Sequence, residues 1–248
     1  MKLKFIACAV LFVLASLAAT AQEQVLHYKV LYTLGFVHKT AAHACMHQQW
    51  CGDSYTATID GHSISWGGRI FSVSDTLRST MRPAPQPAEL AQHITYSNGW
   101  YSKPTTRQWL DGNYCRSCPE EYRNTRGEGL LDASSETMEA VRITTDMLAL
   151  FNTLRHIDFG RLTPQQCFPV VNTVAGGGTQ RVNITYLGPS EMEIDDTDFR
   201  TYDLQFEYYY DGRPSGYCVT CRISRGTRIP LSLSAELPIG HIRMVYEI

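Results

Sequence analysis

The chain has 248 residues, of which 44% are hydrophobic and 19% are charged, and its formal net charge is −2. This composition can supply a hydrophobic core and excludes an intrinsically disordered chain. No basic stripe with interleaved aromatic residues is present, which argues against nucleic acid as a partner. The same charge balance argues against electrostatic binding to a membrane surface.

The N-terminal segment, residues 1–21, has the three parts of a secretory signal peptide. Lys2 and Lys4 form a short positive region, residues 5–17 are apolar apart from Ser16, and Ala19-Thr20-Ala21 is a small-x-small cleavage site. The apolar run is shorter than the roughly 20 residues of a spanning helix, although an uncleaved anchor is the alternative. We expect cleavage after Ala21, export to the periplasm or cell envelope, and a single β-rich mature domain, residues 22–248, without a transmembrane segment.

Short runs of alternating apolar and polar residues dominate the mature chain. In the first run, Leu26, Tyr28, Val30 and Tyr32 alternate with polar neighbours, and similar runs recur between Gly, Asn and Asp residues. Alternation with period two predicts strands that are buried on one face. Asp60-Gly61 and Asp211-Gly212 predict tight turns between such strands. The sequence therefore predicts a mostly β protein, with antiparallel sheet or sheets forming a half-open barrel or a sandwich.

One segment breaks this period. Met147, Leu150, Phe151 and Leu154 follow the i, i+3, i+4, i+7 spacing of a helix that buries one side. Thr144 or Thr145 can cap its N-terminus. We predict one main helix over residues 145–157, with Leu150 and Phe151 buried against the sheet.

Several C-terminal features are similar to a broad family of exported bacterial envelope proteins known only as a domain of unknown function. Residues 146–155, which read Asp-Met-Leu-Ala-Leu-Phe-Asn-Thr-Leu-Arg, resemble its D-x-x-S/A-x-Y/F-x-x-L-R helix. Arg228-Ile229-Pro230-Leu231, followed by Ile239-Gly240-His241-Ile242, resembles its closing R-x-P-V…G-x-V hairpin. The chain departs from the pattern at Ala41-Ala42, where a glycine is expected. The resemblance implies an antiparallel β fold, similar to the half-open barrels of lipoprotein carriers, and no catalytic residues.

Seven of the eight cysteines lie beyond the predicted signal peptide: Cys45, Cys51, Cys115, Cys118, Cys167, Cys218 and Cys221. An oxidising compartment favours disulfides, and an odd number leaves at least one cysteine unpaired. We predict local pairs, Cys45 with Cys51 and Cys115 with Cys118 in a loop, and an unpaired Cys167. Cys218 and Cys221 lie in a strand-like run, where side chains at i and i+3 point to opposite faces.

Metal binding is the alternative use of these residues. The two C-x-x-C pairs, Cys115/Cys118 and Cys218/Cys221, could form a four-cysteine zinc site or act in redox chemistry, although they lie far apart in the sequence. His43, Cys45 and His47 would share one face of a strand and could bind zinc or copper. The two C-x-x-C pairs are much farther apart than in compact zinc ribbons, and the spacing of His43, Cys45 and His47 matches no standard metal motif. We therefore favour structural disulfides and a polar strand face, with no cofactor.

Sequence motifs of common enzymes are missing. The chain has no G-x-S-x-G elbow and no H-E-x-x-H helix, and its acidic run at residues 191–198 lacks the pattern of a calcium loop. Its four tryptophans, Trp50, Trp66, Trp100 and Trp109, could line a ligand groove or fill the core. We therefore expect a non-enzymatic envelope protein that binds an apolar or amphipathic ligand or an envelope partner, with no catalytic residues. The alternatives are a metal- or thiol-dependent enzyme and a structural or assembly factor.

Overall fold

The computed structural model describes residues 22–52, 54–64, 73–81, 88–96, 99–111, 114–119, 123–124, 136–139, 143–174, 178–210 and 213–248. The predicted signal peptide, residues 1–21, lies outside the described residues. None of the described helices is long and apolar enough to span a bilayer.

A single large sheet makes up most of the molecule, as the alternating sequence predicted. Its 16 strands are β1 (Gln22–Leu34), β2 (Val37–Cys51), β3 (Ser54–Ser63), β4 (Val73–Met81), β5 (Ala88–Tyr96), β6 (Gly99–Asp111), β7 (Tyr114–Pro119), β8 (Arg123–Asn124), β9 (Glu136–Glu139), β10 (Ile143–Asp146), β11 (Gln166–Val174), β12 (Gly178–Ile194), β13 (Thr197–Tyr210), β14 (Arg213–Ser224), β15 (Pro230–Glu236) and β16 (His241–Tyr246).

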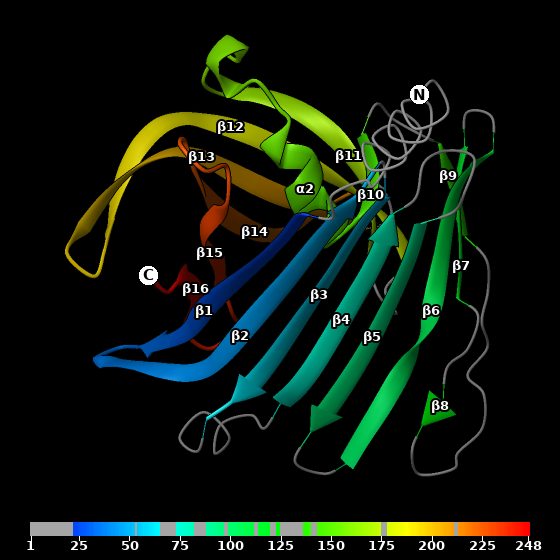
Figure 1. The fold of residues 1–248 in the computed structure, drawn as a ribbon, viewed down its shortest axis with the longest axis horizontal. Coiled ribbons are helices and arrows are strands. Elements are labelled where there is room, and N and C mark those ends of the chain that lie inside the picture. The colour runs from blue at the N-terminus through cyan, green and yellow to red at the C-terminus, as the bar shows by residue number, and fades with distance from the viewer. Residues whose placement is uncertain are drawn as a thin grey trace, which may run out of the picture.

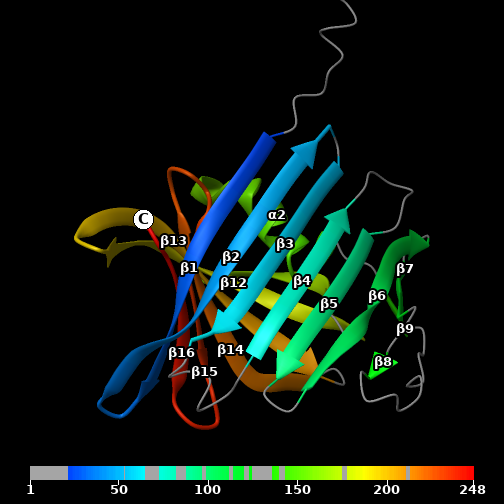
Figure 2. The ribbon, with the colours of Figure 1, turned by 60° about the horizontal axis from the view of Figure 1, so that its bottom comes forward.

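The strand order is β10-β11-β12-β13-β14-β15-β16-β1-β2-β3-β4-β5-β6-β7-β9, and β8 pairs with β6 outside this path. Among the described strands, β10 and β11 pair in parallel and the others pair antiparallel. The sheet bends strongly without closing (Figure 1), and β1 to β6 form one wall of it (Figure 2). The prediction of a mostly antiparallel β fold is thus confirmed, and the single open sheet corresponds to the half-open barrel of the two predicted alternatives, not to the sandwich.

Alternation along β1 and β2 sets the two faces of this wall. Leu26 and Tyr28 are buried, whereas His27 between them is exposed. Tyr28 pairs with Ala44 and Leu26 pairs with Met46, so these side chains lie on the same face. We call this the inner face, and the opposite one, which carries His27, the outer face.

The helix is shorter than predicted. Helix α2 spans Ala149–Arg155, because Thr145 belongs to β10, where it pairs with Asn172 and is 1% exposed. The β-branched Thr144 and Thr145 favour a strand over a helix cap. Leu148 occupies the N-cap position instead, with no side-chain cap. Leu150 is buried as predicted, whereas Phe151 is only half-buried.

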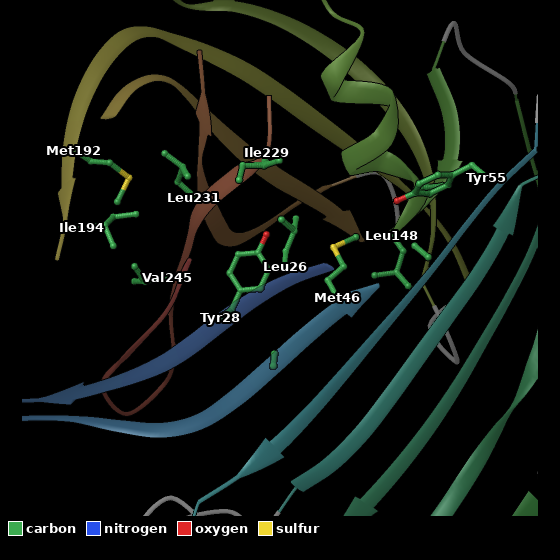
Figure 3. Close-up of a cluster of buried hydrophobic side chains, with 13 residues drawn as sticks. Leu26, Tyr28, Met46, Tyr55, Leu148, Met192, Ile194, Ile229, Leu231 and Val245 are labelled. Atoms are coloured by element: carbon green, nitrogen blue, oxygen red, sulfur yellow. The ribbon is translucent and has the colours of Figure 1, made fainter. Parts of the chain in front are cut away.

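Helix α2 lies inside the bend of the sheet and contacts two hydrophobic clusters (Figure 1). Leu148 and Ala149 belong to a cluster that contains Leu26, Tyr28 and Met46 from β1 and β2 (Figure 3). Leu150 and Leu154 belong to a second cluster with side chains of β12, β13 and β14, namely Val182, Ile184, Tyr186, Tyr202, Leu204, Phe206, Cys221 and Ile223. The helix therefore connects the two arms of the bent sheet.

Candidate functional site

Polar side chains join the C-terminal half of α2 to the inner face of β1 and β2. Trp50 Nε1 donates a hydrogen bond of 2.8 Å to Asn152 Oδ1. Arg155 Nη1 donates one of 2.6 Å to Gln24 Oε1, and its guanidinium lies 5.1 Å from the centroid of the Trp50 ring. These contacts fix the helix to the sheet at one end.

Gln48 lies in the same region and is 2% exposed. The hydroxyl of Tyr55 donates a hydrogen bond of 2.9 Å to Gln48 Oε1. Within the described part of the chain, the buried Gln48 Nε2 has no hydrogen-bond partner. An unsatisfied buried donor typically costs about 1–3 kcal/mol, so this amide is a candidate for binding an oxygen atom from outside the chain.

Strand register explains why these residues come together. Gln24 pairs with Gln48, and Trp50 pairs with Tyr55, so all four side chains point to the inner face. Directly opposite residues on neighbouring strands have Cβ atoms about 5 Å apart. The site cluster, which we define as Gln24, Gln48, Trp50, Tyr55, Asn152 and Arg155, is therefore built from three adjacent strands and one helix.

Apolar side chains surround the site cluster on the inner face. Leu26, Met46 and Ala57 are buried around it. Towards β4, the face continues with half-buried apolar side chains, among them Ile59, Leu77 and Met81. The site cluster is therefore a group of polar side chains in an otherwise apolar environment, and ligand sites combine these two kinds of side chain.

The cationic charge of Arg155 lies within this apolar environment. The side chain is half-buried, and burial lowers the pKa of Arg155 below its usual value. Among the described residues, the Arg155 guanidinium contacts the neutral Gln24 amide and the Trp50 ring and has no carboxylate partner. Burial also raises the pKa of the nearby Tyr28, so that residue stays neutral. An anionic or dipolar group would complement Arg155.

The side chains of the site cluster are suited to binding a ligand. Gln and Asn amides, an indole N–H, a phenol and a guanidinium donate hydrogen bonds, but none is an activated nucleophile or a general base near neutral pH. Aromatic and aliphatic walls can hold an apolar chain, while Gln48 and Arg155 can hold its polar end.

The predicted metal residues of β2 share one face, as expected from their spacing. Cys45 Sγ lies 3.3 Å from His47 Nε2, but His43 Nδ1 lies 3.5 Å from Glu247 Oε2. Register adds His27 and Asp60 as the neighbours of Cys45, which the sequence alone did not indicate. Across the described residues, no three His, Cys, Asp or Glu side chains converge as ligands for a metal ion.

The predicted local disulfides differ from the structure. Cys45 and Cys51 are free thiols on the single strand β2, and six residues of strand span about 20 Å, far beyond bonding distance. Cys115 and Cys118 lie in strand β7 instead of the predicted loop. Cys167 is a free, exposed thiol.

Cys218 and Cys221 lie on one strand with their side chains on opposite faces, as their strand-like sequence predicted. Both lie on β14 and both are free thiols, Cys218 half-buried and Cys221 fully buried. The second C-x-x-C pair therefore does not point its thiols at a common partner.

Of the four tryptophans, Trp50 is the one placed in the site cluster. Trp66 lies outside the described residues, and Trp100 and Trp109 lie on β6. Sequence reasoning missed the other five residues of the site cluster, Gln24, Gln48, Tyr55, Asn152 and Arg155. A usable signal existed for the two glutamines: each continues the period of a buried apolar strand face, Gln24 two positions before Leu26 and Gln48 two positions after Met46.

No family model and no curated protein sequence matches the chain. The structure is similar to the crystal structure of a β-barrel-like protein of domain of unknown function DUF1849 from Brucella abortus, with a TM-score of 0.59 at 8% sequence identity, over 90% of this chain and 96% of that one. A DUF1329 family protein from Desulfovibrio piger is also 8% identical, over 95% of this chain and 88% of that one, but its TM-score of 0.31 is too low to establish a shared fold. The chain thus shares the fold of a β-barrel-like protein whose domain has no known function.

Proposed function

We propose that this chain is a non-enzymatic, exported protein of the cell envelope that binds an amphipathic ligand on the inner face of its half-open barrel. The ligand's apolar part would lie along Ile59, Leu77 and Met81, and a polar oxygen would accept a hydrogen bond from Gln48 Nε2. Export rests on the signal-peptide pattern of residues 1–21.

The observation that carries this proposal is the orphaned amide of Gln48. A glutamine that served only to hold the fold together would have both ends of its amide satisfied, as buried polar groups in native proteins generally do. Here Tyr55 satisfies Oε1, while Nε2 remains unpaired within the described residues. A site that binds a ligand often keeps such a destabilising group, because the ligand completes it.

Gln48 Nε2 has no contact with solvent, so a ligand can reach it only if an element packed on the inner face moves. The helix has seven residues and no side-chain cap at its N-terminus, so its own contribution to stability is small. Its polar attachment to β1 and β2 consists of the Trp50–Asn152 and Arg155–Gln24 hydrogen bonds. We infer that α2 acts as a movable cover over the inner face.

The test compares Gln48→Leu with Gln49→Leu. Gln49 is the exposed neighbour of Gln48 on the opposite face of β2, so its variant removes the same side-chain amide outside the site. Binding of a fluorescent fatty acid, and of palmitate in competition, is measured by titration. Gln48→Leu should weaken binding about tenfold, the equivalent of one hydrogen bond, whereas Gln49→Leu should match the parent protein.

Stability without ligand provides the second readout. If Gln48 serves the ligand, Gln48→Leu should unfold at the same urea concentration as the parent or at a higher one, because it removes an unsatisfied donor. Failure of the parent protein to bind either fatty acid, or equal binding by parent and Gln48→Leu, would contradict the proposal. A large loss of stability in Gln48→Leu would identify Gln48 as a structural residue instead.

A further inference from the structure

A second polar region lies on the outer face, over β14, β15 and β16. A groove of about 240 Å³ is lined there by Thr220, Arg222, Ser232, Ser234, His241 and Arg243. A neighbouring groove of about 360 Å³ extends over β1 and β2, shares His241 and Arg243, and adds the hydroxyls of Thr33 and Thr40. Arg243 therefore lies where the two grooves meet.

Strand register puts the two arginines on either side of β15. Arg222 of β14 pairs with Ser232, and Arg243 of β16 pairs with Ser234. All four side chains point to the same face, with Ser232 and Ser234 on the strand between the two arginines. Thr220, which pairs with Ser234, adds a third hydroxyl.

Acidic side chains compensate this positive charge only in part. Arg222 Nε lies 3.2 Å from Asp203 Oδ2, and the hydroxyl of Thr201 donates a hydrogen bond of 2.9 Å to Asp203 Oδ1. Glu236 Oε1 lies 3.0 Å from His241 Nδ1. Among the described residues, Arg243 has neither an ion pair nor a hydrogen bond to a carboxylate.

Arg243 is also half-buried, so water does not fully solvate its charge. Burial, together with the charge of Arg222, lowers the pKa of Arg243 below its usual value. Two like charges beside each other in a partly desolvated groove destabilise the unoccupied protein. An oxyanion bound between them would relieve that repulsion, and guanidinium forks and hydroxyls are the donors that phosphate oxygens accept from.

We propose that this groove is a binding site for a phosphate group, held by Arg243 and Arg222 with Ser232, Ser234 and Thr220 as hydroxyl donors. The site lies on the opposite face of the sheet from the site cluster and is independent of the function proposed above. The phosphate can be a free ion or small phosphate ester, or it can belong to the headgroup of a lipid.

The test measures binding of inorganic phosphate to the mature chain by calorimetry at constant ionic strength. Arg243→Gln should weaken phosphate binding at least tenfold. Arg78→Gln is the matched control, because Arg78 is an exposed arginine whose partner across β3 and β4, Thr58, lies on the same outer face. Arg243→Lys, which keeps the charge but loses the planar fork, should bind with intermediate affinity.

A second arm distinguishes the source of the phosphate. Vesicles of phosphatidylcholine with added phosphatidylglycerol are sedimented with the parent protein and with both glutamine variants. Vesicle binding that depends on Arg243 supports a lipid headgroup, and phosphate binding without vesicle binding supports a soluble ligand. The proposal is overturned if neither probe binds the parent protein, or if Arg243→Gln and Arg78→Gln weaken binding equally.

Discussion

The hydroxyl of Tyr28 donates a hydrogen bond of 3.0 Å to the carbonyl oxygen of Pro230, across 202 positions of the sequence. Tyr28 lies on β1 and is fully buried, and Pro230 begins β15. This one contact connects the first described strand to the C-terminal part of the sheet, two strands away.

Tyr28 should make stability sensitive to alkali. Burial raises the pKa of Tyr28 well above its usual value near 10, so the folded protein keeps the phenol neutral while the unfolded chain ionises above about pH 10. The contribution of Tyr28 to the free energy of unfolding is therefore complete below pH 10 and is lost as the pH rises further. Tyr28→Phe should cost about 1 kcal/mol at pH 7 and should lose less stability than the parent between pH 9 and 11 in urea unfolding.

Tyr246→Phe is the control for this experiment, because Tyr246 packs edge-on against Tyr28 but is not fully buried. It should show the same alkaline loss as the parent. An unchanged alkaline loss in Tyr28→Phe would show that Tyr28 does not cause the effect.

Gly240 should not tolerate alanine. It has φ of +84°, and an added Cβ would lie 2.6 Å from the carbonyl oxygen of Thr33 and 2.8 Å from the hydroxyl of Tyr32. Gly216 has a similar φ of +77° but no atom within 4 Å of that position. Gly216→Ala should therefore cost about 1 kcal/mol from backbone strain, and Gly240→Ala clearly more. Equal unfolding free energies for the two variants would show that the close contact is relieved without cost.

The thiols should react in the order of their exposure. Cys51 and Cys167 are exposed, whereas Cys221 is fully buried and burial raises its pKa, so its reactive thiolate is scarce. Alkylation of the native protein followed by mass spectrometry should label Cys51 and Cys167 first and Cys221 only after unfolding. Rapid native labelling of Cys221, or a bond between Cys45 and Cys51, would contradict this arrangement of the strands.

Leu154 should be more sensitive to truncation than Phe151. Leu154 is completely buried between α2 and the sheet, so Leu154→Ala should cost about 2–5 kcal/mol. Phe151 is half-buried, and Phe151→Ala should cost less, despite the larger side chain removed. His156→Ala, at an exposed position just after the helix, is the control and should stay close to the parent in urea unfolding. The reverse order of Leu154 and Phe151 would mean that the buried side of α2 is assigned wrongly.

The fold was predictable where a residue pattern is compatible with only one kind of secondary structure. Alternation along β1 and β13 predicted strands, and Asp211-Gly212 predicted the hairpin in which Tyr210 pairs with Arg213. Asp60-Gly61 has the same turn composition, but that prediction was wrong. Strand β3 continues through it, because Gly61 pairs with Ala44 and Asp60 accepts a hydrogen bond of 2.6 Å from Thr76 on β4. Pairing with the neighbouring strands keeps Asp60 and Gly61 in a strand, and the spacing of residues in the sequence does not reveal which strands will pair.

The same limit applies to the candidate sites. Gln48 is a candidate because its buried Nε2 has no partner within the described residues, and this is known only once β1 and β3 are paired on either side of it. Arg222 and Arg243 are 21 positions apart in the sequence and come together through β15. The sequence did predict that Cys218 and Cys221 point apart, because that inference needs only the period of one strand.

The position of β1 between β2 and β16 has a consequence for how the chain folds. A chain that emerges N-terminus first forms the β1–β2 hairpin early, but the other edge of β1 stays unpaired until β16 follows. Pairing between such distant segments is slow, because a long loop must close before any contact forms. During that interval β1 offers an open strand edge to any other extended chain nearby, which makes aggregation the main competitor of folding and gives a holding chaperone a specific segment to protect.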